Sequence, residues 1–168
     1  MKRSFTIASA ITAICLMGFI TALHAQKTDK QEKEAALETA IKNMVEAQRY
    51  KFIAQSMMPM AGRSRQVSFG YDLRVTKDTL NAYLPYVGKA FTADYGGSNG
   101  AISFKTTEFE YLKKDAKKGG WDITITPKNI SNVRQIILRI SLSGFTNVQV
   151  TSNTRDMISF YGYLEDLK

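Results

Sequence analysis

The sequence predicts a mainly β protein, an antiparallel barrel or strongly curved sheet of eight to nine strands with one N-terminal helix. Two observations predict this fold class. From residue 50 onward, short runs alternate apolar and polar residues, which is the pattern of half-buried strands. The connections between these runs are short, and short connections join antiparallel neighbours. This number of strands either closes into a barrel or divides into two packed sheets.

Residues 1–25 are expected to be a secretory signal peptide that is removed. Lys2 and Arg3 form a basic start, residues 5–23 carry no charge, and small residues follow, so we expect cleavage after Ala25. A membrane anchor is the alternative, because the uncharged run approaches the roughly 20 residues that span a bilayer. Its several Thr, Ser and Gly residues favour cleavage. The protein is therefore predicted to be exported to the periplasm or cell envelope, with no transmembrane segment after cleavage.

Cleavage would remove the only cysteine, Cys15, and the only histidine, His24. Cys15 is not expected to carry a lipid, because Ile14 stands before it where a small residue is needed. Without Cys and His, the mature chain has no thiol nucleophile, disulfide, Cys/His zinc site or Ser-His-Asp triad. The most common general base is also missing.

The mature chain, residues 26–168, is expected to form a single domain with a basic surface. Two of the 23 basic residues and none of the 15 acidic ones lie before residue 26, which leaves 21 basic residues and a formal charge of +6. Such a protein can approach an anionic envelope component, although solubility alone also explains the charge. Nucleic acid is not an expected partner, because the compartment is wrong and acidic residues are interspersed.

Residues 28–49 are expected to form the helix. Thr28 and Gln31 fit a capping box at its start. Its apolar residues recur with helical spacing in one narrow stripe, made of Leu37, Ile41, Met44, Val45 and Gln48. We expect this stripe to face the β part of the molecule.

The remainder, residues 50–168, is expected to be antiparallel β. The runs that we interpret as strands are 50–58, 67–76, 80–84, 102–104, 109–111, 121–126, 135–142, 145–152 and 157–165. Turn-forming residues separate them, such as the lysine- and glycine-rich segment 113–120 and the dipeptide Ser143-Gly144. Pro127 is expected to end the sixth run, because proline cannot donate to a strand ladder.

Two stretches of the chain carry a resemblance to a known family. They consist of Leu84, Pro85, Tyr86, Val87 and Gly88 with Phe91 and Tyr95, and of Asn153, Arg155, Ile158, Ser159, Phe160 and Gly162. With the signal peptide and the helix, they resemble the exported bacterial proteins classified as domain of unknown function 4251. The resemblance covers nearly all of the mature region and implies a lipocalin-like antiparallel barrel. The family has no assigned activity, so the resemblance implies no catalytic role for any residue.

The segment 84–100 is the first candidate binding region. Tyr86, Phe91 and Tyr95 lie on a long, partly irregular connection, where binding residues concentrate. They could form an aromatic lip over the mouth of a pocket. Alternatively, these rings seal one end of a barrel or pack under the helix.

The final run is the second candidate, because it is apolar on both faces. Ile158, Phe160 and Leu164 share one face, and Met157, Tyr161 and Tyr163 share the other. Tyrosines beside a lumen would suit a moderately apolar ligand, with the phenols as orienting donors. The alternative is that this second face packs against the helix stripe.

Other motifs are weaker. Met57, Met58 and Met60 could hold Cu(I), but Met57 and Met58 point to opposite faces of a strand, so irregular packing is the simpler interpretation. Glu108 and Glu110 share a face without an evident cleft between carboxylates, which a glycosidase needs. We therefore expect no metal site, no cofactor and no enzymatic activity.

These observations predict an exported, non-enzymatic protein that binds a small apolar or amphipathic ligand, or an envelope component, in or at the mouth of the barrel. The candidate contact residues are Tyr71, Tyr86, Phe91, Tyr95, Tyr161 and Tyr163. The alternative is a structural or protein-interaction module with a filled interior. The two hypotheses differ in the volume of the lumen, because side chains can fill an eight-stranded barrel or leave space for one ligand.

Overall fold

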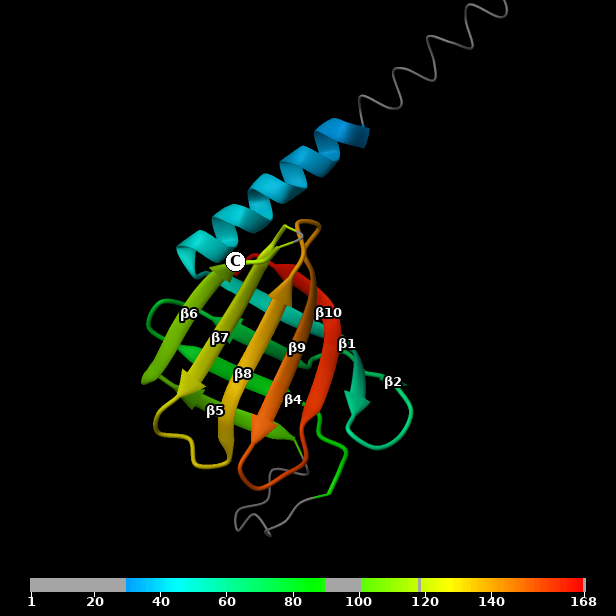
Figure 1. The fold of residues 1–168 in the computed structure, drawn as a ribbon, viewed down its shortest axis with the longest axis vertical. Helices are drawn as coiled ribbons and strands as arrows, with labels where there is room; N and C mark the ends of the chain where they lie inside the picture. The colour runs from blue at the N-terminus through cyan, green and yellow to red at the C-terminus, as the bar shows by residue number, and fades with distance from the viewer. Residues whose placement is uncertain (1–29, 90–100, 118, 168) are drawn as a thin grey trace, which may run out of the picture. The chain divides into compact units, whose positions relative to one another are not determined.

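The computed structural model describes residues 30–89, 101–117 and 119–167, and it is dominated by β-strands (Figure 1). The strands are β1 (Tyr50–Pro59), β2 (Arg65–Gln66), β3 (Asp72–Val75), β4 (Leu80–Leu84), β5 (Ile102–Thr106), β6 (Phe109–Asp115), β7 (Trp121–Pro127), β8 (Val133–Ile140), β9 (Phe145–Ser152) and β10 (Ile158–Glu165). Nine of them follow the order β5-β4-β3-β1-β10-β9-β8-β7-β6, and β2 pairs with β1. All pairs are antiparallel.

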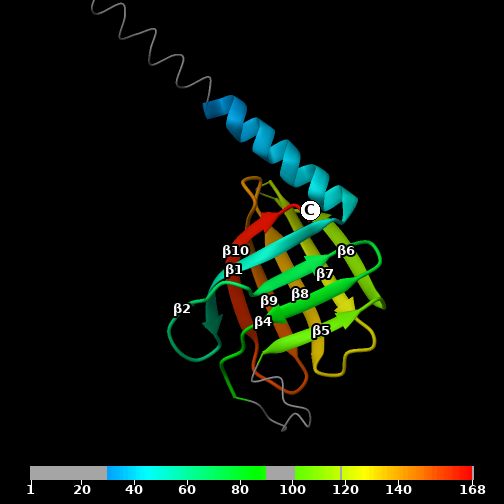
Figure 2. The ribbon, with the colours of Figure 1, turned by 180° about the vertical axis from the view of Figure 1, so that it is seen from behind.

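The sheet is strongly curled. Its two edge strands, β5 and β6, are consecutive in the chain. Figure 2 shows β1, β4 and β5 on one side, with β6 to β10 behind them. The result is a nearly closed antiparallel barrel of nine strands. The predicted fold class is confirmed.

Residues 30–47 form the helix, within the predicted range of 28–49, whose first two residues lie outside the described part. The chain divides into two compact units, Met1–Leu37 and Glu38–Lys168. Within the second unit, Ile41 and Val45 are buried in the core of the barrel, as the stripe predicted. Leu37, which was expected in the same stripe, is exposed.

The stretch from Val67 to Thr76 is not one strand, so that prediction is wrong for its first half. Only β3, at its end, is a regular strand, and Phe69 is fully exposed. Gly70 has a φ of 100°, a left-handed conformation that interrupts an extended chain. The other predicted strands are all present.

The interior of the barrel is filled by side chains. Alternate residues of the main strands point inward and form one apolar cluster. Twelve of its members have no accessible surface at all, and the largest of these are Tyr50, Phe52 and Phe160. A side chain without accessible surface borders no void that could hold water. One cavity, bordered by Tyr86 and Ile158, has a volume of only about 10 Å³, the space of a single water molecule.

Two phenols form a hydrogen bond at the edge of this core. The hydroxyl oxygens of Tyr50 and Tyr111 lie 3.2 Å apart. Tyr50 is fully buried, whereas Tyr111 is half-buried. Burial raises the pKa of both phenols, and the neighbouring Tyr111 raises the pKa of Tyr50 further.

Removing one hydroxyl of this pair is expected to cost more than removing the other. Tyr111→Phe leaves the buried Tyr50 hydroxyl without its partner, which costs about 1–3 kcal/mol of unfolding free energy. Tyr50→Phe leaves the Tyr111 hydroxyl, which can turn to water, and costs about 0.5–1.5 kcal/mol. Urea unfolding of the two variants measures the difference. A greater loss in Tyr50→Phe would contradict the assignment of Tyr50 as the buried partner.

The same pair predicts a loss of stability at high pH. The pKa of Tyr50 is raised well above its ordinary value of 10.0 in the folded protein, so folding favours the neutral phenol. This contribution is fully present below about pH 10 and is lost as the pH rises through the folded-state pKa. The urea midpoint should therefore fall above about pH 10, and it should fall less steeply in Tyr50→Phe. Identical slopes in the two proteins would contradict this.

Candidate functional site

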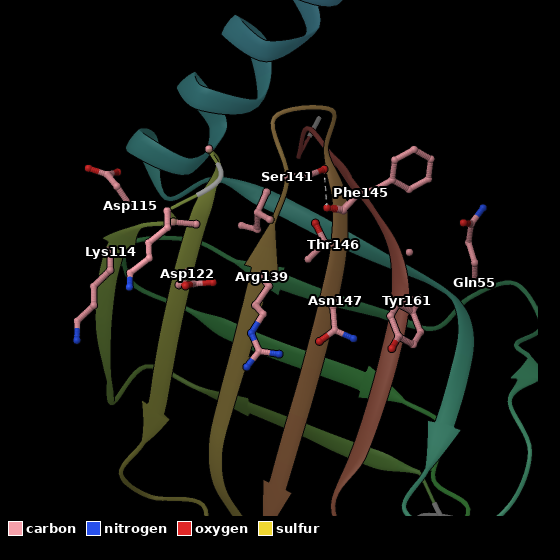
Figure 3. Close-up of a pocket in the computed structure, with 15 residues that line it drawn as sticks. Gln55, Lys114, Asp115, Asp122, Arg139, Ser141, Phe145, Thr146, Asn147 and Tyr161 are labelled. Atoms are coloured by element: carbon pink, nitrogen blue, oxygen red, sulfur yellow. Dashed lines mark hydrogen bonds between the residues drawn. The ribbon is translucent and has the colours of Figure 1, made fainter.

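A groove of about 880 Å³ lies on the outer face of the barrel, beside the turns that connect β6 to β7 and β8 to β9. We call it the outer groove. The side chains that define it come from five strands and are shown in Figure 3: Lys114, Asp122, Arg139, Phe145, Asn147 and Tyr161. It is separate from the core, because the inward-facing neighbours of these residues fill the interior.

Strand register brings five of these residues into one row. The pairs are Lys114 with Asp122, Asp122 with Arg139, Arg139 with Asn147, and Asn147 with Tyr161. On β7 to β10 the residues before and after each row member are buried, so the row faces outward. Because adjacent strands lie about 4.8 Å apart, the row is about 19 Å long.

The end of the row at β10 meets an irregularity in β1. The register shifts between Ala54 and Ser56, so Gln55 is the extra residue of a β-bulge and its side chain borders the groove. Gly162 lies opposite Ala54, and it leaves no room for a side chain, because a Cβ atom there would collide with the carbonyl oxygen of Ile53. Bulges of this kind redirect side chains at functional surfaces.

The polar groups of the row have few partners within the protein. Among the described residues, no ion pair joins Asp122 to Arg139, although they are direct neighbours. Asn147 donates one long hydrogen bond, 3.4 Å, from Nδ2 to the Phe160 carbonyl oxygen. The Tyr161 hydroxyl makes no hydrogen bond within the described part of the chain. These groups can therefore bind a ligand without first breaking strong internal contacts.

Phe145 is held at the rim of the groove by the turn between β8 and β9. Both the backbone N–H and the Oγ of Ser141 donate to the Phe145 carbonyl oxygen, at 2.9 and 3.0 Å. Gly144 has a φ of 81°, and its carbonyl oxygen accepts a hydrogen bond from Thr146 Oγ1 at 3.0 Å. The turn is thus fixed, and the Phe145 ring is left 66% exposed.

The structure brings only part of the predicted site together. Tyr161 lines the outer groove, and Tyr163 lies on the same outer face, opposite Phe145. Tyr71 lies elsewhere and stacks on Tyr83, with ring centres 5.1 Å apart and planes 19° from parallel. Phe91 and Tyr95 lie outside the described residues. Neither Tyr161 nor Tyr163 faces the interior.

Tyr86 belongs to a different cluster, which joins the two stretches that suggested a family. Its hydroxyl donates to the Lys89 carbonyl oxygen at 2.9 Å, and the Arg155 guanidinium lies 4.9 Å from its ring centre. The Asp156 backbone N–H donates to the same carbonyl oxygen at 3.2 Å. Burial raises the pKa of the Tyr86 phenol, and the Asp156 carboxylate raises it further. Together with the 10 Å³ cavity beside it, this packing favours the interpretation that Tyr86 seals the barrel.

Sequence reasoning missed Phe145, Arg139 and Asn147. Their signal was present in the alternation, since each occupies a polar-face position next to a buried residue. What was missing was the pairing that places them beside Tyr161.

Within the described residues, no helix has both the length and the apolar character needed to cross a membrane. In the same part of the chain, no three His, Cys, Asp or Glu side chains group closely enough to hold a metal ion.

The fold and the groove define a class of protein: a nearly closed antiparallel barrel with a filled interior and an open outer groove. The family model described as "Domain of unknown function (DUF4251)" matches residues 32–164, and the chain belongs to this family. A solved relative, the crystal structure of a DUF4251 family protein from Bacteroides eggerthii DSM 20697, is similar with a TM-score of 0.59 and 18% identity. The match covers 81% of this chain and 91% of that one, and at this identity it concerns the fold alone. No curated protein matches the sequence.

Proposed function

We propose that this protein is a non-enzymatic binding protein of the cell envelope that holds a small amphipathic molecule in the outer groove. The observation that carries the proposal is the contrast between a filled interior and an outer groove of about 880 Å³. That volume lies within the range of about 300–1,000 Å³ that is usual for ligand sites. The ligand would therefore bind outside the barrel, not in its lumen.

The composition of the groove favours an amphipathic ligand. The exposed rings of Phe145 and Tyr161 offer apolar area, and Arg139 and Asn147 offer directed hydrogen-bond donors. A few placed polar groups among apolar ones are typical of sites that fix the orientation of a ligand.

The groove offers little support for catalysis. Residues 26–168 contain no His or Cys. The two aliphatic hydroxyls that line the groove have no base beside them: Ser141 Oγ contacts Ser143 Oγ at 3.0 Å and donates to the Phe145 carbonyl oxygen, and Thr146 Oγ1 donates to the Gly144 carbonyl oxygen. These observations support binding without chemistry.

The second candidate is a structural or protein-interaction module, and the filled interior is the observation that favours it. Such a module would use the same outer face for a protein partner. The two candidates differ in whether a small molecule occupies the outer groove.

Native mass spectrometry tests the proposal. The protein is purified from the cells that express it, without detergent. We expect a discrete adduct that is released on denaturation, and we expect Tyr161→Ala to lose most of it. The matched control is Tyr83→Ala, because Tyr83 is 46% exposed and Tyr161 is 44% exposed, but Tyr83 lies outside the groove. An adduct-free protein, with no thermal shift against single-chain amphiphiles or glycans, would overturn the proposal in favour of the interaction module.

A further inference from the structure

The outer face of the three strands β8, β9 and β10 is polar, and its charges do not form a patch of one sign. Eleven alternate positions of these strands face outward: Gln135, Ile137, Arg139, Phe145, Asn147, Gln149, Thr151, Ser159, Tyr161, Tyr163 and Glu165. Two of them, Arg139 and Glu165, carry opposite charges, and Arg134 is exposed at the bulge in β8. The outer groove lies over one part of this face.

Amide and hydroxyl groups occupy most of the other outward positions. The eleven positions include three amide side chains, two aliphatic hydroxyls and two phenols. Of these, Asn147 and Tyr161 line the outer groove. Each of these groups can both donate and accept a hydrogen bond. A ligand with many hydroxyl groups has the same dual character, so a hydroxyl-rich molecule can pair with either kind of group.

Other ligand classes fit this face less well. A lipid chain would cover the amide of Asn147 without replacing its hydrogen bonds to water, which is unfavourable. A polyanion needs several cations, yet the basic residues of the groove, Lys114, Lys117 and Arg139, are nearly balanced by Asp115 and Asp122. The charge pattern therefore favours a neutral or weakly charged ligand.

The exposed aromatic rings complete the match. The rings of Phe145 and Tyr161 present flat apolar surfaces at the groove. A sugar ring has an apolar face of C–H groups that can cover such a ring while its hydroxyls remain at the edge. Beside Tyr161, the row continues over about 14 Å with Asn147, Arg139 and Asp122. The Asn147 amide both donates and accepts, the Arg139 guanidinium donates and the Asp122 carboxylate accepts.

We infer that the outer groove binds an oligosaccharide, with a sugar ring against Tyr161 and hydroxyls on Asn147, Arg139 and Asp122. This inference rests on the proposed function and names the class of its ligand. The row is long enough for several sugar units, so a chain fits it better than a single sugar.

Isothermal titration calorimetry and a glycan array test the inference on the protein as purified from cells. The calorimetry probes are the hexasaccharides of glucose, mannose and N-acetylglucosamine, and monomeric dodecylphosphocholine is the amphiphile probe. We expect at least one saccharide to bind. Tyr161→Ala should weaken it at least tenfold, Tyr161→Phe less than threefold, and Tyr83→Ala not at all.

Each remaining outcome has a definite meaning. Binding of dodecylphosphocholine alone, weakened by Tyr161→Ala, would overturn the saccharide inference and leave the proposed function standing. No binding of either probe class, on the array or in solution, would overturn both. If Tyr161→Ala binds the saccharide as tightly as the unsubstituted protein, the assignment of the saccharide to the outer groove would be overturned. If that variant fails to fold, NMR shift changes in the unsubstituted protein give the same answer, since they should concentrate on Asn147, Arg139 and Tyr161.

Discussion

Gly162→Ala is expected to destabilise the folded protein by about 3 kcal/mol, although it adds only one methyl group. A Cβ atom at this position would collide with the carbonyl oxygen of Ile53 and would lie 2.9 Å from Cε2 of Phe52. Both neighbours are on β1, and the Ile53 oxygen is part of the backbone that pairs with β10. It cannot move away without disturbing the ladder that joins the two halves of the barrel.

Thermal and urea unfolding measure this loss, and the melting temperature should fall by about 10 °C. Gly70→Ala is the matched control, because Gly70 has a φ of 100° but no atom within 4 Å of an added Cβ. Its cost is the backbone strain alone, about 1–2 kcal/mol. Equal losses in the two variants would show that β1 and β10 separate easily and would contradict the close approach at Gly162.

The strands were predictable because their side chains alternate between core and solvent. In β7, Trp121, Ile123 and Ile125 are buried and the residues between them are half-buried, which the sequence shows directly as a period of two. The alternation at Val67 and Phe69 misled the prediction, because Gly70 changes the backbone direction there. A pattern of residue types does not include the φ angle of a glycine.

The outer groove could be predicted only in part, because it depends on register. The strands β6 to β10 are consecutive along the chain, so their neighbours follow from short turns. The alignment of Asp122 with Arg139 and of Asn147 with Tyr161 depends on where each turn begins, and alternation leaves that open by two residues. The pairing of β1 with β10, including the bulge at Gln55, joins residues about 100 positions apart or more. No local pattern indicates them.

The sequence also did not predict whether the interior of the barrel is filled. Whether a barrel of this size holds side chains or a ligand depends on its shear and on which large residues meet inside. Phe52 and Phe160 come from adjacent strands, and both have no accessible surface. The apolar face of the last strand therefore fills the lumen, and its tyrosine face lies outside.

Two phenylalanines on neighbouring strands are expected to separate folding from binding. Phe160→Ala should lose about 3–5 kcal/mol of unfolding free energy, because it removes a ring from a site with no accessible surface and leaves a cavity. Phe145→Ala should change stability by no more than about 0.5 kcal/mol, because the Phe145 ring is 66% exposed. Urea unfolding of both variants checks these values.

Ligand retention should show the opposite order. Phe145→Ala removes a ring from the outer groove and should weaken binding, whereas Phe160→Ala, studied at a temperature where it stays folded, should retain the ligand. This reversal is specific to a ligand outside the barrel. A ligand in the lumen would contact Phe160 and ignore Phe145, so loss of binding in Phe160→Ala alone would move the site into the interior. The two variants remove the same kind of side chain from opposite faces of the sheet. Measuring both stability and ligand retention in each of them therefore locates the ligand, even when its identity is unknown.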